Sequence, residues 1–367
     1  MTPDTEANST PPFRPRGQLL PVTVGFVPLL DAALLIVAKE EGFAAQEGLD
    51  LTLIRENSWA AVRDKLNVGL YDAAHMLAPA AIASVLGIGH LQVPLVSAVA
   101  LNLDGNAITV SHKVADHLRD ALSGEGAVSP TMTARALSGL IAQRAASGEP
   151  ALTVGVVFGF SCHLYQVQAW LRLGGIDPDK AVRFVVIPPP LMVESLAAGL
   201  IDVFCAGAPW NRMAEAAGAG MVLHPCSEII ECCPEKLLVM RDRQAQSPWA
   251  PGLIRTITRA AVWASDGSNR ALLARHLARP DYIGAPVAMM DDILSGQVMT
   301  LFGESRRPWI KLDLDATRPT RARLRSVFDM MDQAGHITGQ GSRWPDASAM
   351  LRTDLYDEAL GGAVKGH

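Results

Sequence analysis

The sequence predicts an α/β protein built from two related lobes that face each other across a cleft. The main observation is an internal repeat. VTVGFV at 22–27 recurs as LTVGVV at 152–157, and LNVGLYDAA at 66–74 recurs as LAAGLIDVF at 196–204. Both pairs are offset by 130 residues. This period is too long for a solenoid and indicates two duplicated α/β units.

The elements between these landmarks follow the same order in both copies. A β-branched strand comes first, then a helical stretch and then a second strand. These are 22–27, 33–43 and 49–56 in the first copy, and 152–157, 164–175 and 182–189 in the second. The strands are apolar on both faces, which is typical of parallel sheets covered by helices. In the L-x-x-G-x-x-D unit, Gly69 and Gly199 are expected at helix C-termini.

The repeat also predicts how the chain is divided. We expect the first lobe at 20–107 and 208–345, and the second lobe at 108–207. Tails are expected at 1–19 and 346–367. From Ser247 onward the pattern is mostly helical, with amphipathic segments at 255–264 and 269–278.

Composition narrows the classes of function. The chain is 49% hydrophobic and 19% charged, so it can bury a large core. A formal charge of -5 argues against the concentrated basic face that nucleic-acid or anionic-membrane binding needs. A small ligand or a protein partner is the better expectation.

Targeting and cysteine signals favour a reducing compartment. The polar, Pro-rich start lacks the apolar core of an export signal, and no run reaches the ~20 apolar residues that span a bilayer, so a cytoplasmic location is expected. The number of cysteines is odd and shows no paired framework, so we expect them to be reduced thiols. A zinc site from Cys226, Cys232, Cys233 and His224 lacks paired C-x-x-C units, so no metal is expected. Phosphate-loop, zinc-hydrolase and serine-hydrolase motifs are missing, which argues against an enzyme.

His163 is the residue with the most open role. In VVFGFSCHLY it follows a turn of small residues and stands at the expected start of a helix. Between two such lobes, helix N-termini and strand ends attract anions. The residues alone leave four roles open: a core residue, a metal ligand beside Cys162, a catalytic base and an anion-binding group.

Several motifs, in order along the chain, resemble a known family. They are GFVPLLDAALLIVAKEEGF, SWAAVRDKL, DAAHMLAP, LNLDGNAITVS, GGIDP, PPP before LMVESLAAGLIDVFCAGAPW, and PEK. Together they resemble the nitrate and bicarbonate solute-binding proteins of ABC transporters, from about Val22 to Arg241. The resemblance implies the type 2 periplasmic-binding-protein fold, with two Rossmann-like lobes around a ligand cleft.

The resemblance also implies the site. Trp59, Asn106, His163 and Lys236 would surround the anion, and Pro189 would form part of the wall. Asn106 stands where the family commonly has glutamine, and Lys236 favours nitrate or nitrite over bicarbonate. Nitrate only accepts hydrogen bonds, so its pocket should offer donors and positive charge, with no unpaired carboxylate. His75 is expected to be a buried, hydrogen-bonded residue of the first lobe.

By resemblance, the expected function is a cytoplasmic nitrate or nitrite sensor from the sensor/antiterminator pair of nitrate assimilation. Its partner would be an ANTAR-type RNA-binding antiterminator, released when the ligand binds. One alternative is the solute-binding subunit of a nitrate or bicarbonate ABC transporter. Another is an enzyme on the same fold that resembles thiamine pyrimidine synthase. No cofactor, direct nucleic-acid contact or membrane insertion is expected.

Overall fold

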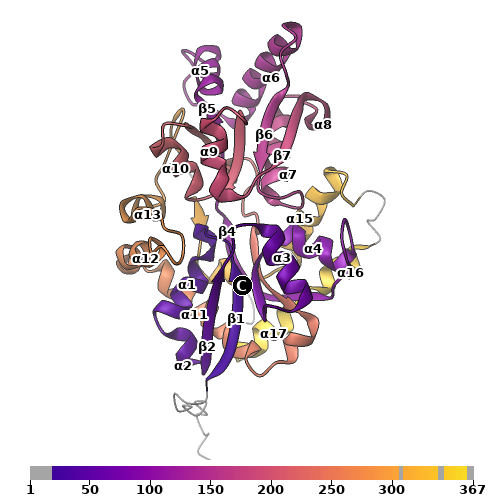
Figure 1. The fold of residues 1–367 in the computed structure, drawn as a ribbon, viewed down its shortest axis with the longest axis vertical. Helices are drawn as coiled ribbons and strands as arrows, with labels where there is room; N and C mark the ends of the chain where they lie inside the picture. Colours follow the sequence, from indigo (N-terminus) through magenta and orange to yellow (C-terminus); the bar gives the residue numbers. More distant parts are fainter. Residues whose placement is uncertain (1–18, 306–308, 338–342, 362–367) are drawn as a thin grey trace, which may run out of the picture.

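The computed structural model describes residues 19–305, 309–337 and 343–361. Two lobes are stacked along the long axis of the molecule (Figure 1). Lobe 1 begins with β1 (Leu20–Phe26), the 3₁₀ helix η2 (Leu30–Ala32), α1 (Ala33–Glu40), α2 (Phe43–Gln46), β2 (Leu49–Arg55), α3 (Trp59–Val68), β3 (Ala73–Leu77), α4 (Ala78–Leu86) and β4 (Leu95–Asp104). The α/β architecture predicted from the repeat is confirmed.

Lobe 2 forms the other end of the molecule. It contains β5 (Asn106–Ser111), α5 (His112–Ala121), α6 (Pro130–Ala146), β6 (Leu152–Val156), α7 (Cys162–Leu173), α8 (Pro178–Ala181), β7 (Val182–Val186), η3 (Pro189–Leu191), α9 (Met192–Ala197), β8 (Val203–Gly207), α10 (Trp210–Ala216) and β9 (Gly220–Pro225).

The remaining elements belong mainly to lobe 1. They are η4 (Cys226–Glu228), β10 (Lys236–Arg241), η5 (Asp242–Gln246), α11 (Ala250–Ser265), η6 (Gly267–Asn269), α12 (Arg270–Leu277), α13 (Val287–Leu294), β11 (Val298–Thr300), β12 (Gly303–Ser305), β13 (Ile310–Lys311), α14 (Leu314–Thr317), α15 (Arg321–Gln333), α16 (Trp344–Ala349) and α17 (Thr353–Ala359). Of the predicted amphipathic segments, 255–264 lies within α11, and α12 covers 269–278 except for its two end residues.

The two sheets repeat one topology. Lobe 1 has the order β13-β4-β10-β3-β1-β2 and lobe 2 has β7-β6-β8-β5-β9. In each sheet three parallel strands are followed by an antiparallel strand, β10 beside β3 and β5 beside β8. The duplicated sequence therefore folds into duplicated sheets.

The aspartate of the L-x-x-G-x-x-D unit has the same role in both lobes. The Thr23 N–H donates to Asp72 Oδ2 at 2.9 Å, and the Asp72 N–H returns a bond to the Thr23 carbonyl at 2.9 Å. The equivalent bonds between Thr153 and Asp202 measure 2.8 Å each. Each carboxylate thus ties the turn before one strand to the start of the neighbouring strand.

Two of the crossings between the lobes lie close to the junction in the described part of the chain. The first lies between β4 and β5 at Gly105, whose φ of +112° suits glycine. The second is the 226–235 segment between β9 and β10.

The strand pairing moves the expected lobe boundaries. The expected lobe 2 was 108–207, but β5 joins its sheet from residue 106, and β9 pairs with β5 through Ala107 and Pro225. Residues 210–225 therefore belong with lobe 2 rather than lobe 1. The repeat ends near 204 and carried no signal for β9.

The expected 346–367 tail is also wrong for its described part, which contains most of α16 and all of α17. Of the expected 1–19 tail, only residue 19 is described.

The C-terminal part of the chain contacts both lobes. Helix α15 packs against α4 of lobe 1 and α7 of lobe 2. The Tyr165 hydroxyl on α7 lies 2.8 Å from Nδ1 of His336, just after α15. No helix in the described ranges is both long and apolar enough to cross a bilayer.

Candidate functional site

A group of buried polar side chains from both lobes lies where the lobes meet. Each member is at most 2% exposed, so these charges and hydrogen-bonding groups are removed from bulk water. We call this group the junction cluster. It consists of Asp31, Trp59, His75, Asn106, His163, Gln166, Glu235 and Lys236.

Asp31 links two members of the cluster that come from neighbouring strands. Its Oδ2 lies 2.7 Å from Lys236 Nζ, and its Oδ1 lies 2.9 Å from His75 Nε2. The Val27 N–H points at His75 Nδ1 from 3.4 Å, which assigns the ring proton to Nε2 and lets His75 donate to Asp31. Lys236 is therefore paired rather than free.

A chain of amides continues the cluster into lobe 2. Asn106 Nδ2 donates to Gln166 Oε1 at 2.9 Å, and Gln166 Nε2 donates to Glu235 Oε1 at 2.6 Å. The second carboxylate oxygen of Glu235 lies 3.6 Å from Lys236 Nζ. The polar contacts thus run without interruption from one lobe to the other.

The environment shifts the pKa values of the charged members. Burial alone would raise the pKa of Asp31, but Lys236 and His75 hold it well below its usual range. Burial alone would lower the pKa of Lys236, yet Asp31 and Glu235 raise it above the usual value. Asp31 and Lys236 are therefore both charged at neutral pH.

Glu235 and His163 respond mainly to burial. Burial raises the pKa of Glu235, although Lys236 and Gln166 oppose the shift. Burial lowers the pKa of His163 well below its usual value, and Lys236 adds to that effect. His163 is thus neutral, with one ring N–H to donate.

Several polar atoms of the cluster make no hydrogen bond within the described chain. Those that also lack an ion-pair partner are Trp59 Nε1, both ring nitrogens of His163, and Asn106 Oδ1. A buried polar group left in this way costs about 1–3 kcal/mol. Because native proteins rarely leave such groups unused, these atoms indicate a ligand-binding surface.

Contacts among these residues place them around one small volume. Lys236 Nζ lies 5.8 Å from the centre of the Trp59 ring. A Cβ added to Gly207 at the end of β8 would lie 3.5 Å from Asp31 Oδ2 and 3.6 Å from Asn106 Oδ1. Gly207 therefore lets groups from the two lobes approach each other closely.

Local structure explains why these side chains face the junction. Trp59 is the first residue of α3, whose N-cap Ser58 accepts from the Ala61 N–H at 3.2 Å. His163 is the second residue of α7, whose N-cap Ser161 accepts from the Leu164 N–H at 3.2 Å. Capped helix starts carry positive partial charge, which favours an anion beside them.

The structure brings four of the five expected site residues together. Trp59, Asn106, His163 and Lys236 lie in the junction cluster, and their contact with an anion stays a prediction. Pro189 is buried at the start of η3, and no described contact joins it to the cluster. His75 is buried and bonded to Asp31.

Sequence reasoning missed three members of the cluster: Asp31, Gln166 and Glu235. Asp31 could have been noticed, because it is the one charged residue in the apolar stretch from 26 to 38. The site does contain carboxylates, and that of Asp31 is paired with Lys236 and His75.

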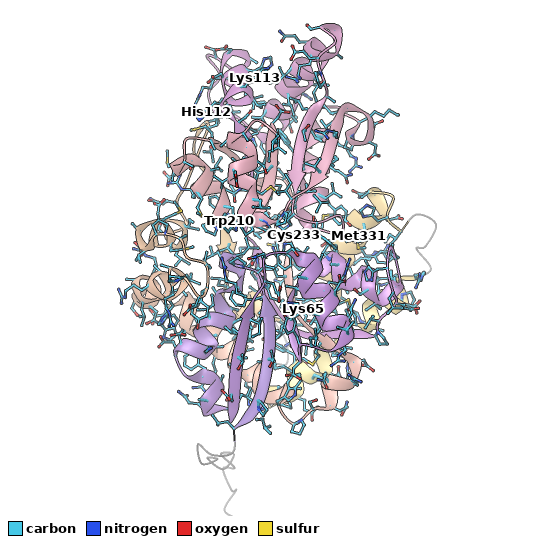
Figure 2. All side chains as sticks on the ribbon, viewed as in Figure 1. Lys65, His112, Lys113, Trp210, Cys233 and Met331 are labelled. Atoms are coloured by element: carbon cyan, nitrogen blue, oxygen red, sulfur yellow. The ribbon has the colours of Figure 1, made fainter. Side chains whose placement is uncertain are left out.

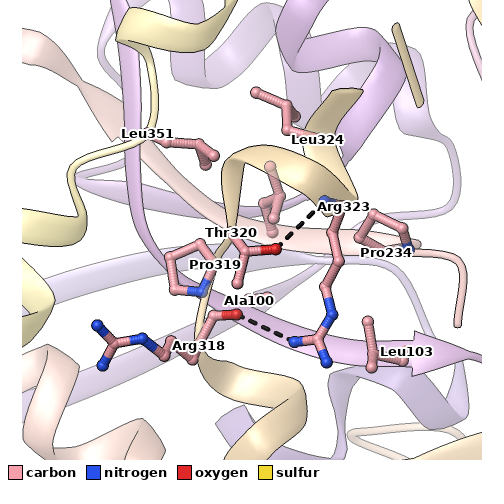
Figure 3. Close-up of a pocket in the computed structure, with 10 residues that line it drawn as sticks. Ala100, Leu103, Pro234, Arg318, Pro319, Thr320, Arg323, Leu324 and Leu351 are labelled. Atoms are coloured by element: carbon pink, nitrogen blue, oxygen red, sulfur yellow. Dashed lines mark hydrogen bonds between the residues drawn. The ribbon is translucent and has the colours of Figure 1, made fainter. Parts of the chain in front are cut away.

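A separate hollow lies beneath the loop between α14 and α15 (Figure 3). Thr320 Oγ1 accepts from the Arg323 N–H there at 3.2 Å. Its lining is largely apolar and includes Ala100, Leu103 and Leu351. This hollow does not offer the buried donors of the junction cluster.

Comparison with known proteins identifies the fold and the family. Residues 17–278 match the NMT1-like family. The crystal structure of the periplasmic nitrate-binding protein NrtA from Synechocystis PCC 6803 superposes with a TM-score of 0.84 at 24% identity, covering 95% of this chain and 90% of that one. The predicted periplasmic-binding-protein fold is therefore confirmed.

Two curated relatives have higher sequence identity. The nitrate import ATP-binding protein NrtC of Synechocystis sp. (strain ATCC 27184 / PCC 6803 / Kazusa) is 34% identical over 92% of this chain. The nitrate/nitrite binding protein NrtA of Nostoc sp. (strain PCC 7120) is 29% identical over 82% of this chain. The chain spans 49% of the length of the first and 66% of the second.

Proposed function

Since this chain belongs to the NMT1-like family, we propose that it is a binding protein, not an enzyme, and that it holds nitrate or nitrite between its two lobes. The proposal draws on the relatives named for nitrate import and nitrate/nitrite binding. The observation that carries it is a set of buried donors with no hydrogen-bond partner among the described residues, Trp59 Nε1 from lobe 1 and the His163 ring from lobe 2.

The chemistry of these donors suits a small oxyanion. Nitrate and nitrite accept hydrogen bonds and donate none, so an indole N–H and an imidazole N–H are matched partners. Lys236 supplies the nearby positive charge, and the start of α7 adds its helix dipole. Donors from both lobes would contact one anion, so binding favours the closed arrangement of the lobes.

The charge balance favours a monovalent ligand. Lys236 and Asp31 already neutralise each other at 2.7 Å inside a desolvated cluster. Because this pair carries no net charge, each negative charge on the ligand is costly at low dielectric, and a divalent anion is costlier than a monovalent one. We therefore expect nitrate and nitrite to bind more tightly than sulfate.

Calorimetric titration of the purified protein tests the binding proposal. Nitrate, nitrite, bicarbonate, sulfate and a short alkanesulfonate are compared at one ionic strength. The expected result is one site per chain for nitrate or nitrite, with weaker binding of the other anions. Equal binding of all five anions, or no binding of nitrate and nitrite, would refute the proposal.

Two outputs are compatible with such a binding protein. The names of the relatives support delivery of the anion to a nitrate importer, the alternative expected from the sequence. The second candidate is the cytoplasmic sensor, in which ligand binding releases an ANTAR-type antiterminator. It rests on the resemblance and on the contacts of α15 with both lobes, because such a helix would register a change in their angle.

Co-purification separates the two outputs. The sensor output predicts a complex with the antiterminator that dissociates when nitrate or nitrite is added, and the partner must weaken anion binding by the same factor. The delivery output predicts ligand-dependent stimulation of a nitrate permease and its ATPase, with no effect of the antiterminator on anion affinity.

A further inference from the structure

Most of the cysteines gather close to the junction cluster without belonging to it. Cys162, Cys205, Cys226 and Cys233 are buried and not disulfide-bonded. Cys205 Sγ and Cys226 Sγ lie 3.6 Å apart. A buried group of thiols beside a carboxylate has no role in the anion chemistry described above.

Two of these thiols and one carboxylate meet in a smaller group. Cys162 Sγ, Cys233 Sγ and a carboxylate oxygen of Glu235 all lie within 4.8 Å of one another. All three residues are at most 1% exposed. We propose that Cys162, Cys233 and Glu235 bind a Zn²⁺ ion between the lobes.

The separation of the ligand atoms suits this ion. Two sulfurs that are each about 2.3 Å from a zinc ion are at most about 4.6 Å apart, and a carboxylate oxygen binds at about 2.0–2.2 Å. The observed group therefore needs only small side-chain rotations to close around the ion. Three protein ligands leave a fourth position for water.

The donor set selects the class of metal. Thiolate sulfur is a soft ligand that favours Zn²⁺ over Mg²⁺ or Ca²⁺, which prefer oxygen alone. Glu235 Oε2 accepts no hydrogen bond from any described residue and lies 3.6 Å from Lys236 Nζ, so its remaining lone pairs can coordinate a metal ion. Binding forms two zinc–sulfur bonds and one zinc–oxygen bond and releases the thiol protons to solvent.

The backbone holds the ligands in place from both sides of the junction. Cys162 is the first residue of α7 in lobe 2. Cys233 lies in the 226–235 segment, where its N–H donates to Asp104 Oδ1 at 3.0 Å and its carbonyl accepts from the Asp104 N–H at 2.8 Å. Figure 2 shows Cys233 at the level where the lobes meet. A bound ion would therefore join lobe 2 to the crossing segment.

This proposal departs from the sequence-based expectation of no metal. That expectation considered Cys226, Cys232 and Cys233 with His224, which are close in sequence. The proposed ligands Cys162 and Cys233 are far apart in the chain and only the fold brings them together.

Titration of the reduced, chelator-treated protein with Co²⁺ tests the site. We expect one ion per chain, with visible ligand-field bands of a tetrahedral site, a near-ultraviolet sulfur-to-metal band, and displacement by Zn²⁺. Cys162→Ser, Cys233→Ser and Glu235→Gln should each lose or weaken these bands. Cys226→Ser is the matched control, because it removes a buried neighbouring thiol outside the ligand set and should keep them.

A second measurement needs no variant. The ¹¹³Cd NMR shift of the wild-type protein reports the donor atoms and should show two sulfurs. No band with Co²⁺, bands that survive in the Cys162→Ser/Cys233→Ser double variant, or a cadmium shift without sulfur would each overturn the proposal. Nitrate titration of the metal-free protein tests the proposed function separately. The zinc proposal and the nitrate-binding proposal can therefore fail independently of each other.

Discussion

Replacing Lys236 by methionine is the most informative perturbation of the junction cluster. The change removes the ammonium that lies 2.7 Å from Asp31 Oδ2, while methionine keeps most of the apolar volume. Both side chains are at most 2% exposed, so the Asp31 carboxylate is left in a desolvated site with His75 as its remaining ion-pair partner among the described residues.

The magnitude follows from this burial. Removing one partner of a buried ion pair costs about 3–5 kcal/mol, mainly because the other charge stays uncompensated. Removing both charges avoids that cost, so the Asp31→Asn/Lys236→Met variant should recover about 2–3 kcal/mol relative to the sum of the single changes. Neither variant should bind nitrate, because both lack the cation.

The assay is urea unfolding followed by tryptophan fluorescence and circular dichroism, used where both probes coincide. The control is Arg119→Met, which breaks an ion pair whose partners are 45% and 68% exposed and should cost less than about 1 kcal/mol. Additive losses in the double variant would refute the buried-pair reasoning. Nitrate binding by Lys236→Met with wild-type affinity would remove Lys236 from the site.

Three further perturbations test neighbouring features. Trp59→Phe removes an N–H without a partner among the described residues, so the free energy of unfolding should change by less than about 1 kcal/mol. Nitrate affinity measured by calorimetry should fall about 10-fold. Unchanged affinity would contradict the assignment of Trp59 to the binding site. Gly207→Ala adds a carbon 3.5 Å from Asp31 Oδ2 and should weaken nitrate binding, whereas Gly267→Ala meets nothing within 4 Å and should not. Burial lowers the pKa of His336, so protons are taken up on unfolding and thermal stability should fall as the pH drops below 6.5; in melts across pH, His336→Gln should reduce this dependence.

Four members of the junction cluster were expected from the family resemblance, and among them only His163 was also singled out by its local sequence. His163 follows a turn before a helix, and Trp59 and His163 both come directly after or within two residues of a serine N-cap. Asn106 and Lys236 each begin a strand. Capping and strand initiation depend on neighbouring residues and can be recognised in a sequence, but they do not by themselves mark a binding residue.

The partners of these residues could not be located in the same way. Asp31 meets Lys236 across 205 positions, and Gln166 meets Glu235 across 69. Neither pair has a spacing that a helix or a strand would impose. For the same reason the pairing of Lys236 with Asp31 was not expected from the sequence.

The sequence by itself determined the duplicated α/β lobes, because the repeat preserves the alternation of strands and helices that a parallel sheet requires. Only the tertiary structure decided which polar groups are buried together, where β9 belongs, and that Cys162 approaches Cys233. The physical reason is that hydrophobic patterning acts within a segment, whereas charge pairing and metal-ligand geometry depend on how the two lobes pack where the chain crosses between them.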